Sequence, residues 1–201
     1  MTYSSDVAFT STVKAIQAQR GSRESYARME AKGGWATTVD PVLAAFLAEA
    51  DSFYLATANA AGQPYVQHRG GPRGFLRVLD ERTLGFTDFK GNRQYISTGN
   101  LADNPHAFVF VMDYANRRRI KIWGTARVVD ADANLLTRLF PAGYNAKPDQ
   151  AILFTIAAWD SNCPQHIPQK IAADDVAALV DRYERRIALL EAEVAGLRAE
   201  T

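Results

Sequence analysis

Between Phe53 and Trp159 the sequence consists of short runs of β-favouring residues separated by turn residues. In the clearest run, Arg119–Val129, apolar and polar residues alternate, as in a strand with one covered face and one solvated face. Similar runs lie at residues 53–58, 64–69, 75–79, 83–87, 107–112 and 151–159. This spacing indicates antiparallel strands joined by short turns, and we expect about six of them.

Several helices are expected around these strands. Up to Lys32 the sequence is polar with sparse apolar residues, whose spacing predicts one or two amphipathic helices broken near Gly21. Asp40–Pro41 predicts a helix start, with a carboxylate cap and proline at the first helical position. The buried face of that helix is expected to carry Val42, Phe46 and Leu47. Further helices are expected at residues 93–101 and 133–140.

These elements predict a mainly β chain with helices, in the β or α+β class. A small antiparallel six-stranded barrel buries such strands without leaving unpaired edges, and a β-sandwich is the competing architecture. We expect a helical extension at residues 1–39, the barrel at residues 40–168 and a separate C-terminal helix at residues 169–201.

The C-terminal segment carries a heptad pattern. Apolar residues recur at alternating four- and three-residue steps, which is the spacing of a coiled-coil stripe: Val176, Val180, Tyr183, Ile187, Leu190, Val194 and Leu197. About three heptads is the lower limit for a coiled coil. Two interpretations stay open, because the helix can pack against a partner chain or against its own barrel.

The composition is that of an ordinary globular protein, with 201 residues, 47% hydrophobic residues and a net charge of +1. This charge balance gives no reason to expect a nucleic-acid or membrane-surface binder. Cys163 is the single cysteine, which excludes an internal disulfide and a multi-cysteine zinc site. The first residues do not form a signal peptide and no apolar run spans a bilayer, so we expect a cytoplasmic protein.

The segment Phe89–Gln94 is the first candidate for chemistry. A strand is expected to run into a glycine-containing turn and then into a helix, whose first backbone N–H groups attract anions. Lys90 and Arg93 add cationic donors and Asn92 adds an amide, which suits a terminal phosphate group. The same residues also fit an ordinary helix cap with two solvated cations.

The segment Gln67–Gly74 is the second candidate, since it holds three glycines within five residues. Such glycines indicate special backbone angles or a close approach to a ligand. A flat ring system suits this surface, and Gln67 and Arg69 offer hydrogen bonds to its polar edge. The alternative is a glycine-rich bulge between strands.

Two further segments are rich in polar groups. Tyr114–Arg119 contains three consecutive arginines, which indicate either an anion contact across a subunit boundary or an exposed turn. Trp159–Pro168 is polar and is held by two prolines. Within it Cys163 and His166 suggest a thiolate nucleophile or a metal pair, but no further ligand lies at metal spacing, so we expect no metal. The alternative is a packed loop with an inert thiol.

In their order along the chain, these segments resemble the pyridoxamine 5′-phosphate oxidase-like flavin-binding superfamily from about Asp40 to Pro168. Residues 84–94 resemble the strand-to-helix phosphate motif of that family, and residues 118–124 resemble its following strand. Residues 162–168 resemble a subgroup of uncharacterised flavin-nucleotide-binding proteins. The resemblance implies a split β-barrel that forms a homodimer with FMN at the interface, FAD being the alternative flavin.

The resemblance also implies roles for particular residues. The implied cofactor-binding residues group by role as follows: Gln67, His68 and Arg69 along the isoalloxazine; Thr87 and Asp88 at the ring or ribityl chain; Asn92 and Arg93 at the phosphate, with Lys90 nearby; Arg118 and Arg119 from the other chain; and Trp159, Gln165 and His166 closing the pocket.

The activity implied is that of an FMN-dependent oxidoreductase acting on a small molecule. Genuine pyridoxamine phosphate oxidases end in a basic substrate-binding segment, whereas this chain continues through Gln169–Lys170 into the heptad helix. Pyridoxamine phosphate is therefore not the expected substrate. Two alternatives remain: a non-catalytic flavin- or haem-binding protein, with His68 or His166 as the haem ligand, and a structural dimer organised by the C-terminal helix.

Overall fold

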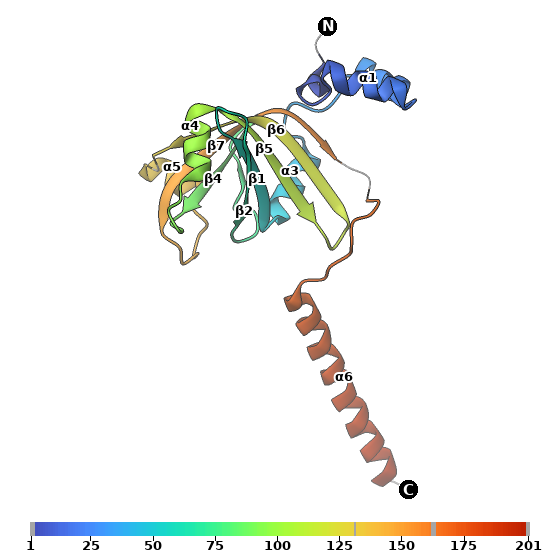
Figure 1. The fold of residues 1–201 in the computed structure, drawn as a ribbon. Coiled ribbons are helices and arrows are strands. Elements are labelled where there is room, and N and C mark those ends of the chain that lie inside the picture. The colour runs from blue at the N-terminus through green and yellow to red at the C-terminus, as the bar shows by residue number, and fades with distance from the viewer. Residues whose placement is uncertain (1–2, 131, 162–163, 200–201) are drawn as a thin grey trace. The chain divides into compact units, whose positions relative to one another are not determined.

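The structure is a computed structural model that describes residues 3–130, 132–161 and 164–199 (Figure 1). The chain divides into two compact units. The first unit comprises residues 1–112 and 119–163, and the second comprises residues 113–118 and 164–201. The first unit holds the sheet, and the second holds a long C-terminal helix.

The first unit is built on one seven-stranded sheet with the order β2-β1-β5-β6-β7-β4-β3. Its strands are β1 (Ser52–Ala58), β2 (Pro64–Gly70), β3 (Arg77–Val78), β4 (Thr83–Phe89), β5 (His106–Asp113), β6 (Arg118–Val129) and β7 (Pro148–Ser161). The pairs β1–β2, β1–β5, β3–β4, β4–β7 and β6–β7 are antiparallel. The chain is therefore of the α+β class with a mainly antiparallel sheet, as expected.

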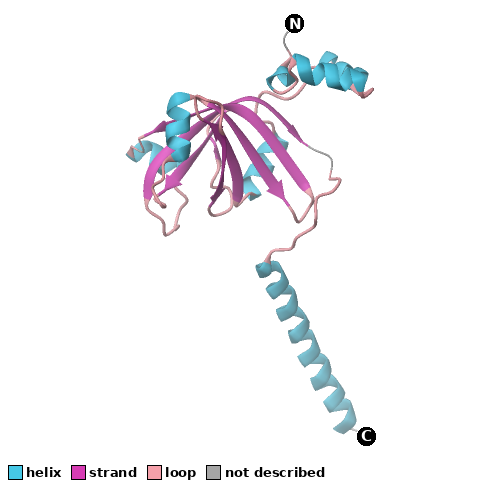
Figure 2. Cartoon of the chain, viewed as in Figure 1, coloured by secondary structure: helices cyan, strands magenta, loops and turns pink. Residues whose placement is uncertain are grey.

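The structure has seven strands rather than the expected six, one for each of the seven runs, including the run at residues 75–79. The strand of that run, β3, has only two residues, while Phe75 and Leu76 before it are buried side chains of the core. The sheet is also open rather than closed, because among the described residues no backbone pairing joins its end strands β2 and β3. It is a single sheet, so the β-sandwich is excluded. Figure 2 shows the strands fanning out and curving.

The helices are a 3₁₀ turn η1 (Ser4–Val7) and α1 (Ser11–Gln19), α2 (Arg23–Ala31), α3 (Pro41–Glu49), α4 (Ile96–Asp103), α5 (Ala133–Leu139) and α6 (Ala173–Ala199). The break between α1 and α2 at Gly21 is confirmed. Asp40 caps α3 as predicted, its carboxylate accepting a hydrogen bond from the Leu43 N–H at 2.7 Å. Val42 is wrong as a core residue, because it is 67% exposed and Leu43 takes its place beside Phe46 and Leu47.

The core lies between the concave face of the sheet and α3. Its largest completely covered side chains come from α3, the strands and the segment before β3: Leu43, Leu47, Phe53, Leu55, Phe75, Leu84, Phe86, Ile122, Ile152 and Phe154. Phe53 stacks with Phe75 and meets Phe86 edge-on, with ring centroids 5.5 and 5.1 Å apart. Alternate residues of each strand supply this core, so the alternation that predicted the strands also accounts for the core.

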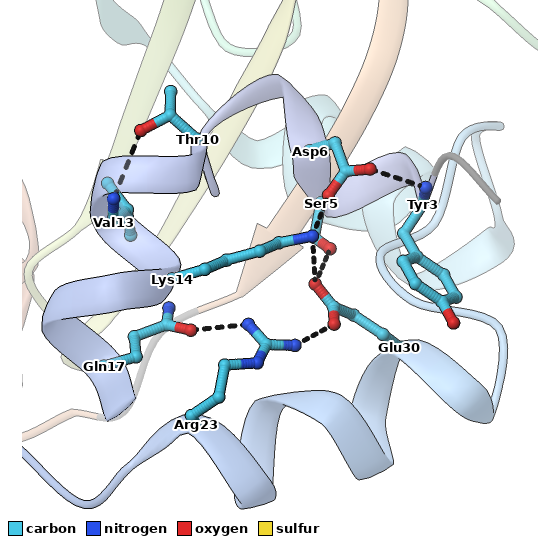
Figure 3. Close-up of polar contacts among 9 residues, drawn as sticks. All are labelled: Tyr3, Ser5, Asp6, Thr10, Val13, Lys14, Gln17, Arg23 and Glu30. Atoms are coloured by element: carbon cyan, nitrogen blue, oxygen red, sulfur yellow. Dashed lines mark hydrogen bonds and ion pairs between the residues drawn. The ribbon is translucent and has the colours of Figure 1, made fainter. Parts of the chain in front are cut away.

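A small polar network fixes the helices of the N-terminal extension (Figure 3). The carboxylate of Glu30, only 3% exposed, accepts hydrogen bonds from Ser5 and Arg23 and lies 3.4 Å from the Lys14 ammonium. Lys14 in turn donates to Asp6 at 2.5 Å. A buried carboxylate is tolerated only when such partners compensate it, so these contacts hold η1, α1 and α2 in one arrangement.

The extension is joined to the sheet by the segment after α2. Ala36 forms an isolated antiparallel bridge with Trp159 of β7, and the Trp159 indole N–H donates to the Thr38 carbonyl at 2.8 Å. Trp35 stacks on Trp123 of β6, with ring centroids 4.6 Å apart. The extension is thus part of the first unit.

The second unit combines the β5–β6 turn with the segment that precedes α6. The Gln169 side chain donates to the Ala115 carbonyl at 2.8 Å, and the Lys170 ammonium lies 4.3 Å from the centre of the Tyr114 ring. Hydrogen bonds from Asn116 and Arg118 hold the pKa of Asp113 below its ordinary value, outweighing the raising effect of its partial burial. The turn is therefore a fixed anchor for the segment that follows His166.

Candidate functional site

A polar cavity of about 230 Å³ lies where the two ends of the sheet approach each other. Its lining comes from β2, β4, the loop after β4 and the start of α4: Tyr65, Gln67, Arg69, Asp88, Phe89, Gly91, Asn92, Arg93, Gln94, Tyr95, Ile96, Ser97, Thr98 and Asp149. We call it the split cavity. It brings together the two segments, Gln67–Gly74 and Phe89–Gln94, that the sequence singled out separately.

Strand β2 supplies one wall through its period of two. Residues 65, 67 and 69 are partly buried, while their neighbours 64, 66, 68 and 70 are exposed. Tyr65, Gln67 and Arg69 therefore share the face that lines the cavity. The Ser97 hydroxyl of α4 donates to the Gln67 side-chain carbonyl at 2.8 Å, which fixes the amide of Gln67 against the helix.

An ion pair joins the ends of the sheet. Arg69 of β2 binds Asp88 of β4, and the two side chains are only 13% and 11% exposed. The second Asp88 oxygen accepts a hydrogen bond from Gln150 of β7 at 2.9 Å. Since β2 and β4 are not neighbours in the sheet, side chains rather than backbone hydrogen bonds connect its two ends here.

The loop after β4 holds two residues in the left-handed region. Arg93 has φ 58° and Tyr95 has φ 53°, a conformation that costs a residue with a side chain of order 1 kcal/mol or more. Tyr95 is the N-cap of α4 and makes no side-chain capping bond. The first turn of α4, Ile96–Thr98, lines the cavity, so its backbone N–H groups and the positive end of its dipole lie beside Arg93.

A second, smaller hollow of about 160 Å³ shares Arg69, Asp88 and Phe89 with the split cavity. It is also lined by His68, Gly70, Phe75, Phe86 and Thr87. Thr87 is 2% exposed, and its hydroxyl is buried without a hydrogen-bond partner. The Nε of Arg69 is likewise buried and unpartnered. Buried polar atoms are normally paired, so these two groups are available to a polar ligand or to a water molecule.

The residues of the split cavity and of the adjoining hollow fit a flavin mononucleotide. The uncapped helix start, Arg93 and the Asn92 amide suit a phosphate dianion. The unpaired Arg69 Nε and Thr87 hydroxyl suit the oxygen and nitrogen atoms of a flavin edge or its ribityl chain. The volume of the cavity is smaller than the roughly 300–1,000 Å³ of sites that enclose a whole cofactor, so part of such a ligand would lie outside it.

Trp159 lies elsewhere. It lines a third hollow of about 750 Å³ between the N-terminal extension and strands β6 and β7, together with Phe9, Trp35 and Trp123. Lys121 stands over both Trp35 and Trp123 and pairs with Asp160 at 3.0 Å. The structure therefore separates Trp159 from the lining of the split cavity, and its side chain serves to attach the extension.

The remaining residues with implied roles are also outside the lining. Lys90 is exposed, and its backbone N–H donates a hydrogen bond to the Lys147 carbonyl at 2.9 Å. Arg118, Gln165 and His166 are exposed residues of the second unit, and Arg118 binds Asp113 at 2.7 Å. Arg119, on β6, has a buried Nε without a partner. Asn162 and Cys163, including the proposed thiol, lie outside the described residues.

Sequence reasoning missed several residues that line or support the cavity. These are Tyr65, Ser97, Thr98, Asp149 and Gln150. Tyr65 has a signal in the sequence, since it continues the alternation of Gln67 and Arg69. Gln150 and Asp149 have none, because only the pairing of β7 with β4 brings Gln150 beside Asp88.

None of the helices within residues 3–130, 132–161 and 164–199 is long and apolar enough to cross a membrane. In the same residues, no three histidine, cysteine, aspartate or glutamate side chains gather as a metal site would require.

Comparison with known proteins then identifies the family. A family model described as pyridoxamine 5′-phosphate oxidase matches residues 39–163. The chain belongs to this family. The match covers the sheet and both segments that line the split cavity, and it leaves out the N-terminal helices and α6. Comparison with curated protein sequences gives no significant match.

Three of the solved structures that the chain matches are as follows. HupZ from Group A Streptococcus has 16% identity and a TM-score of 0.51, and the match covers 66% of this chain and 99% of that chain. A general stress protein 26-related protein of the pyridoxinephosphate oxidase family, from Clostridium acetobutylicum, has 13% identity and a TM-score of 0.45, with 66% and 92% covered. HutZ, the heme storage protein from Vibrio cholerae, has 17% identity and a TM-score of 0.39, with 59% and 89% covered. At 16% identity, the match to HupZ shows a common fold.

Proposed function

We propose that this protein binds FMN in the split cavity and acts as a flavin-dependent oxidoreductase on a small molecule. The observation that carries the proposal is the pair of buried, unpartnered donors, Arg69 Nε and Thr87 Oγ1. Arg69 lines the split cavity together with the start of α4 and Arg93, and Thr87 lines the adjoining hollow that shares Arg69. An apolar ligand would leave both donors unsatisfied, whereas a flavin with its phosphate offers acceptors for each part of the site.

Each wall has its own part in holding the ligand. Arg93, Asn92 and the first turn of α4 bind the phosphate, because together they offer charge and unpaired N–H groups. Gln67 and Arg69 donate hydrogen bonds to the flavin edge, and Thr87 donates to the ring or ribityl chain. Asp88 keeps Arg69 in place and balances its charge, so Arg93 is the cation of the lining that is left for the phosphate, and Asp149 is the other acid of the lining.

The site is completed by a second copy of the chain. A cavity of about 230 Å³ encloses only part of FMN, so another surface must cover the rest. Arg118 and Arg119 of the second copy are the candidates for this cover, as the family resemblance implies. Arg119 has the stronger case, because its Nε is buried and lacks a partner.

The bound flavin would supply hydride or electron transfer, and the protein supplies position and charge. No side chain of the split cavity needs to act as a nucleophile. The substrate is a small molecule other than pyridoxamine phosphate, because the chain has the heptad helix in place of the basic C-terminal segment of the genuine oxidases. Reduction of the flavin requires an electron donor of the nicotinamide class or the substrate itself.

The direct test is titration of the purified protein with FMN, followed by flavin fluorescence and by the visible absorbance spectrum. Saturable quenching at one FMN per chain is expected, with weaker binding of riboflavin because it lacks the phosphate. A colourless protein that leaves FMN fluorescence unchanged would contradict the proposal.

The same titration separates the haem alternative. A Soret band on adding haem, with no response to FMN, would favour a haem-binding protein. Loss of that band in His68→Ala or His166→Ala would then identify the ligand. His68 lines the second hollow, and its ring stands edge-on to Tyr54 with centroids 5.6 Å apart.

A further inference from the structure

Helix α6 presents an uncovered apolar stripe within its own unit. The helix has 27 residues, about 40 Å of length, and none of its described residues is buried. Val180, Ile187 and Leu190 are 47%, 53% and 41% exposed. A helix with so regular a stripe needs a second surface to cover it, because an exposed amphipathic helix gains little from its own apolar face.

The residues of the stripe select a particular kind of partner. With Val176 at a d position, the a positions are Val180, Ile187 and Val194, and all three are β-branched. Two of the following d positions are Leu190 and Leu197. β-Branched residues at a with leucine at d favour a parallel two-stranded coiled coil. In such a dimer the a and d side chains pack into the facing helix with different geometries, and β-branched residues suit the first and leucine the second. Val176 and Tyr183, at the other two d positions, depart from this rule.

The charges beside the stripe agree with the same arrangement. In a parallel, in-register dimer each g residue faces the e residue five positions later on the other helix. Arg186 at g then faces Glu191 at e, and Glu193 at g faces Arg198 at e, so both charged pairs are attractive. In an antiparallel dimer centred on the Ile187–Leu190 layer, Arg186 would face Glu193 but Glu184 would face Glu191, so one of these two charged contacts is repulsive.

The outer face of the helix is suited to contact with solvent. Asp181 and Arg185, at b and f positions, form an exposed pair along the helix with 3.9 Å between their charged atoms. Leu189, at a c position, is the one large apolar residue on that side and is 64% exposed. The polar pair lies away from the a and d positions, so it would stay in solvent when two helices associate.

We propose that α6 pairs with α6 of a second copy as a parallel, in-register, two-stranded coiled coil. The partner is this chain itself, because the charges that flank the stripe are complementary to their own copy. A parallel pair has its two-fold axis along the helices, so it is compatible with a symmetric dimer of the sheet units. The pairing extends the dimer of the proposed function through a segment outside the family match.

The test is oxidative cross-linking of the full chain with a single engineered cysteine. Cys163→Ser removes the one native thiol. Leu190→Cys in that background places a thiol at a d position, and Ala192→Cys places one at an f position only two residues away. We expect rapid, nearly complete covalent dimer from Leu190→Cys and little from Ala192→Cys, since only facing positions come within disulfide distance.

Charge reversal tests the register. Arg186→Glu in the Leu190→Cys background sets like charges face to face, and we expect dimer formation to slow several-fold at low salt. Adding Glu191→Arg restores opposite charges in the parallel register and should restore the rate. Equal cross-linking at 190 and 192, or no recovery in the double variant, would overturn the proposal.

Packing of α6 against its own sheet unit gives a different result, in which Leu190→Cys forms no dimer, and this also overturns the proposal.

Sedimentation of a chain ending at Lys170 and its titration with FMN separate this inference from the proposed function. We expect the shortened chain to bind FMN and to dissociate at a higher concentration than the full chain. Loss of FMN binding in the full chain would refute the function while leaving the cross-linking result intact.

Discussion

Two buried charges carry much of what is specific to the split cavity. Arg69 and Asp88 come from strands at opposite ends of the sheet, and each is almost covered. Their mutual attraction has to offset the loss of hydration of both groups, which is why a buried pair adds little net stability but is costly to break. Gln150 satisfies the second carboxylate oxygen and so completes the pair.

Removing one member of this pair should therefore be severe. Asp88→Ala leaves Arg69 buried without its counter-charge, and we expect a loss of about 3–5 kcal/mol in the free energy of unfolding, measured with urea. Asp88→Asn keeps an acceptor for Gln150 and should cost less. Arg69→Met combined with Asp88→Leu removes both charges and should recover much of the loss. A cost below about 1 kcal/mol for Asp88→Ala would show that the pair is solvated.

Arg93 is the residue whose charge is expected to matter for the cofactor. Arg93→Ala removes one charge-assisted contact, worth about 1.5–3 kcal/mol, so the Kd for FMN should rise roughly 10- to 150-fold. The Kd for riboflavin should hardly change, because riboflavin has no phosphate. Fluorescence titration with both ligands measures the two values.

Two variants control this measurement. Arg93→Lys keeps the charge and should bind FMN better than Arg93→Ala. Arg73→Ala removes an exposed cation that pairs with Glu49 and lines neither hollow, so it should leave both Kd values unchanged. Equal weakening of FMN and riboflavin by Arg93→Ala would count against the phosphate assignment.

At the scale of elements, the pairing of β6 with β7 depends on one glycine. The register of the two strands shifts between Trp123 and Gly124. A Cβ atom on Gly124 would lie 2.0 Å from the Thr155 carbonyl oxygen and 2.7 Å from the Phe154 ring. Neither neighbour can yield easily, because one is backbone and the other is a core side chain only 1% exposed.

Gly124→Ala should accordingly lower the free energy of unfolding by at least about 3 kcal/mol, since the strands must separate to admit the methyl group. Gly99→Ala is the matched control. Gly99 lies within α4 with open space around it, so alanine should raise the free energy of unfolding by about 0.5–1 kcal/mol. Urea unfolding of both variants checks the contrast, and similar stabilities would disprove the account.

The sequence predicted the elements well where one pattern determined them. The strands followed from alternation, because a strand with one covered face shows it directly. The start of α4 did not follow: the helix was expected from Arg93 and begins at Ile96. The left-handed residues Arg93 and Tyr95 delay it, and non-glycine residues give no sign of that conformation in a sequence. The prediction for Val42 was wrong for a simpler reason, because the buried face of α3 carries Leu43 instead.

On the scale of the whole molecule, the sequence identified segments of the candidate site but not their arrangement in one cavity. The segments around Gln67 and Asn92 were found because glycines and cations mark them. Their meeting in one cavity depends on the strand order, which no local pattern encodes. The resemblance to a family implied that both segments meet one flavin, whereas the strand order and the contact of Gln67 with Ser97 on α4 come from the structure.

The N-terminal extension makes part of the stability depend on pH. Hydrogen bonds from Lys14 and from the Tyr3 N–H lower the pKa of Asp6 in the folded state. Between this pKa and the ordinary value of about 3.9, the unfolded state binds more protons than the folded state. The contribution of Asp6 is therefore complete above the ordinary value and is lost as the pH falls through the folded pKa.

We expect the thermal midpoint of the protein to fall more steeply below about pH 4 than that of Asp6→Asn. The hydrogen bond to Asp6 also raises the pKa of Lys14, so this pair persists through the alkaline range up to the lysine titration. Thermal unfolding at low salt and stepped pH measures the difference. Parallel curves for the two proteins would exclude this role for Asp6.

The open sheet also determines which part of the protein should unfold locally before the rest. Strand β2 forms backbone hydrogen bonds with β1 on one side, and within the described residues its other side is joined only through side chains such as Arg69 and Gln67. Its amide hydrogens should exchange with solvent through a local detachment that spares the central strands. A ligand held between β2 and α4 would slow that exchange selectively, so deuterium uptake along residues 64–70 reports occupancy of the cavity without any colour or turnover.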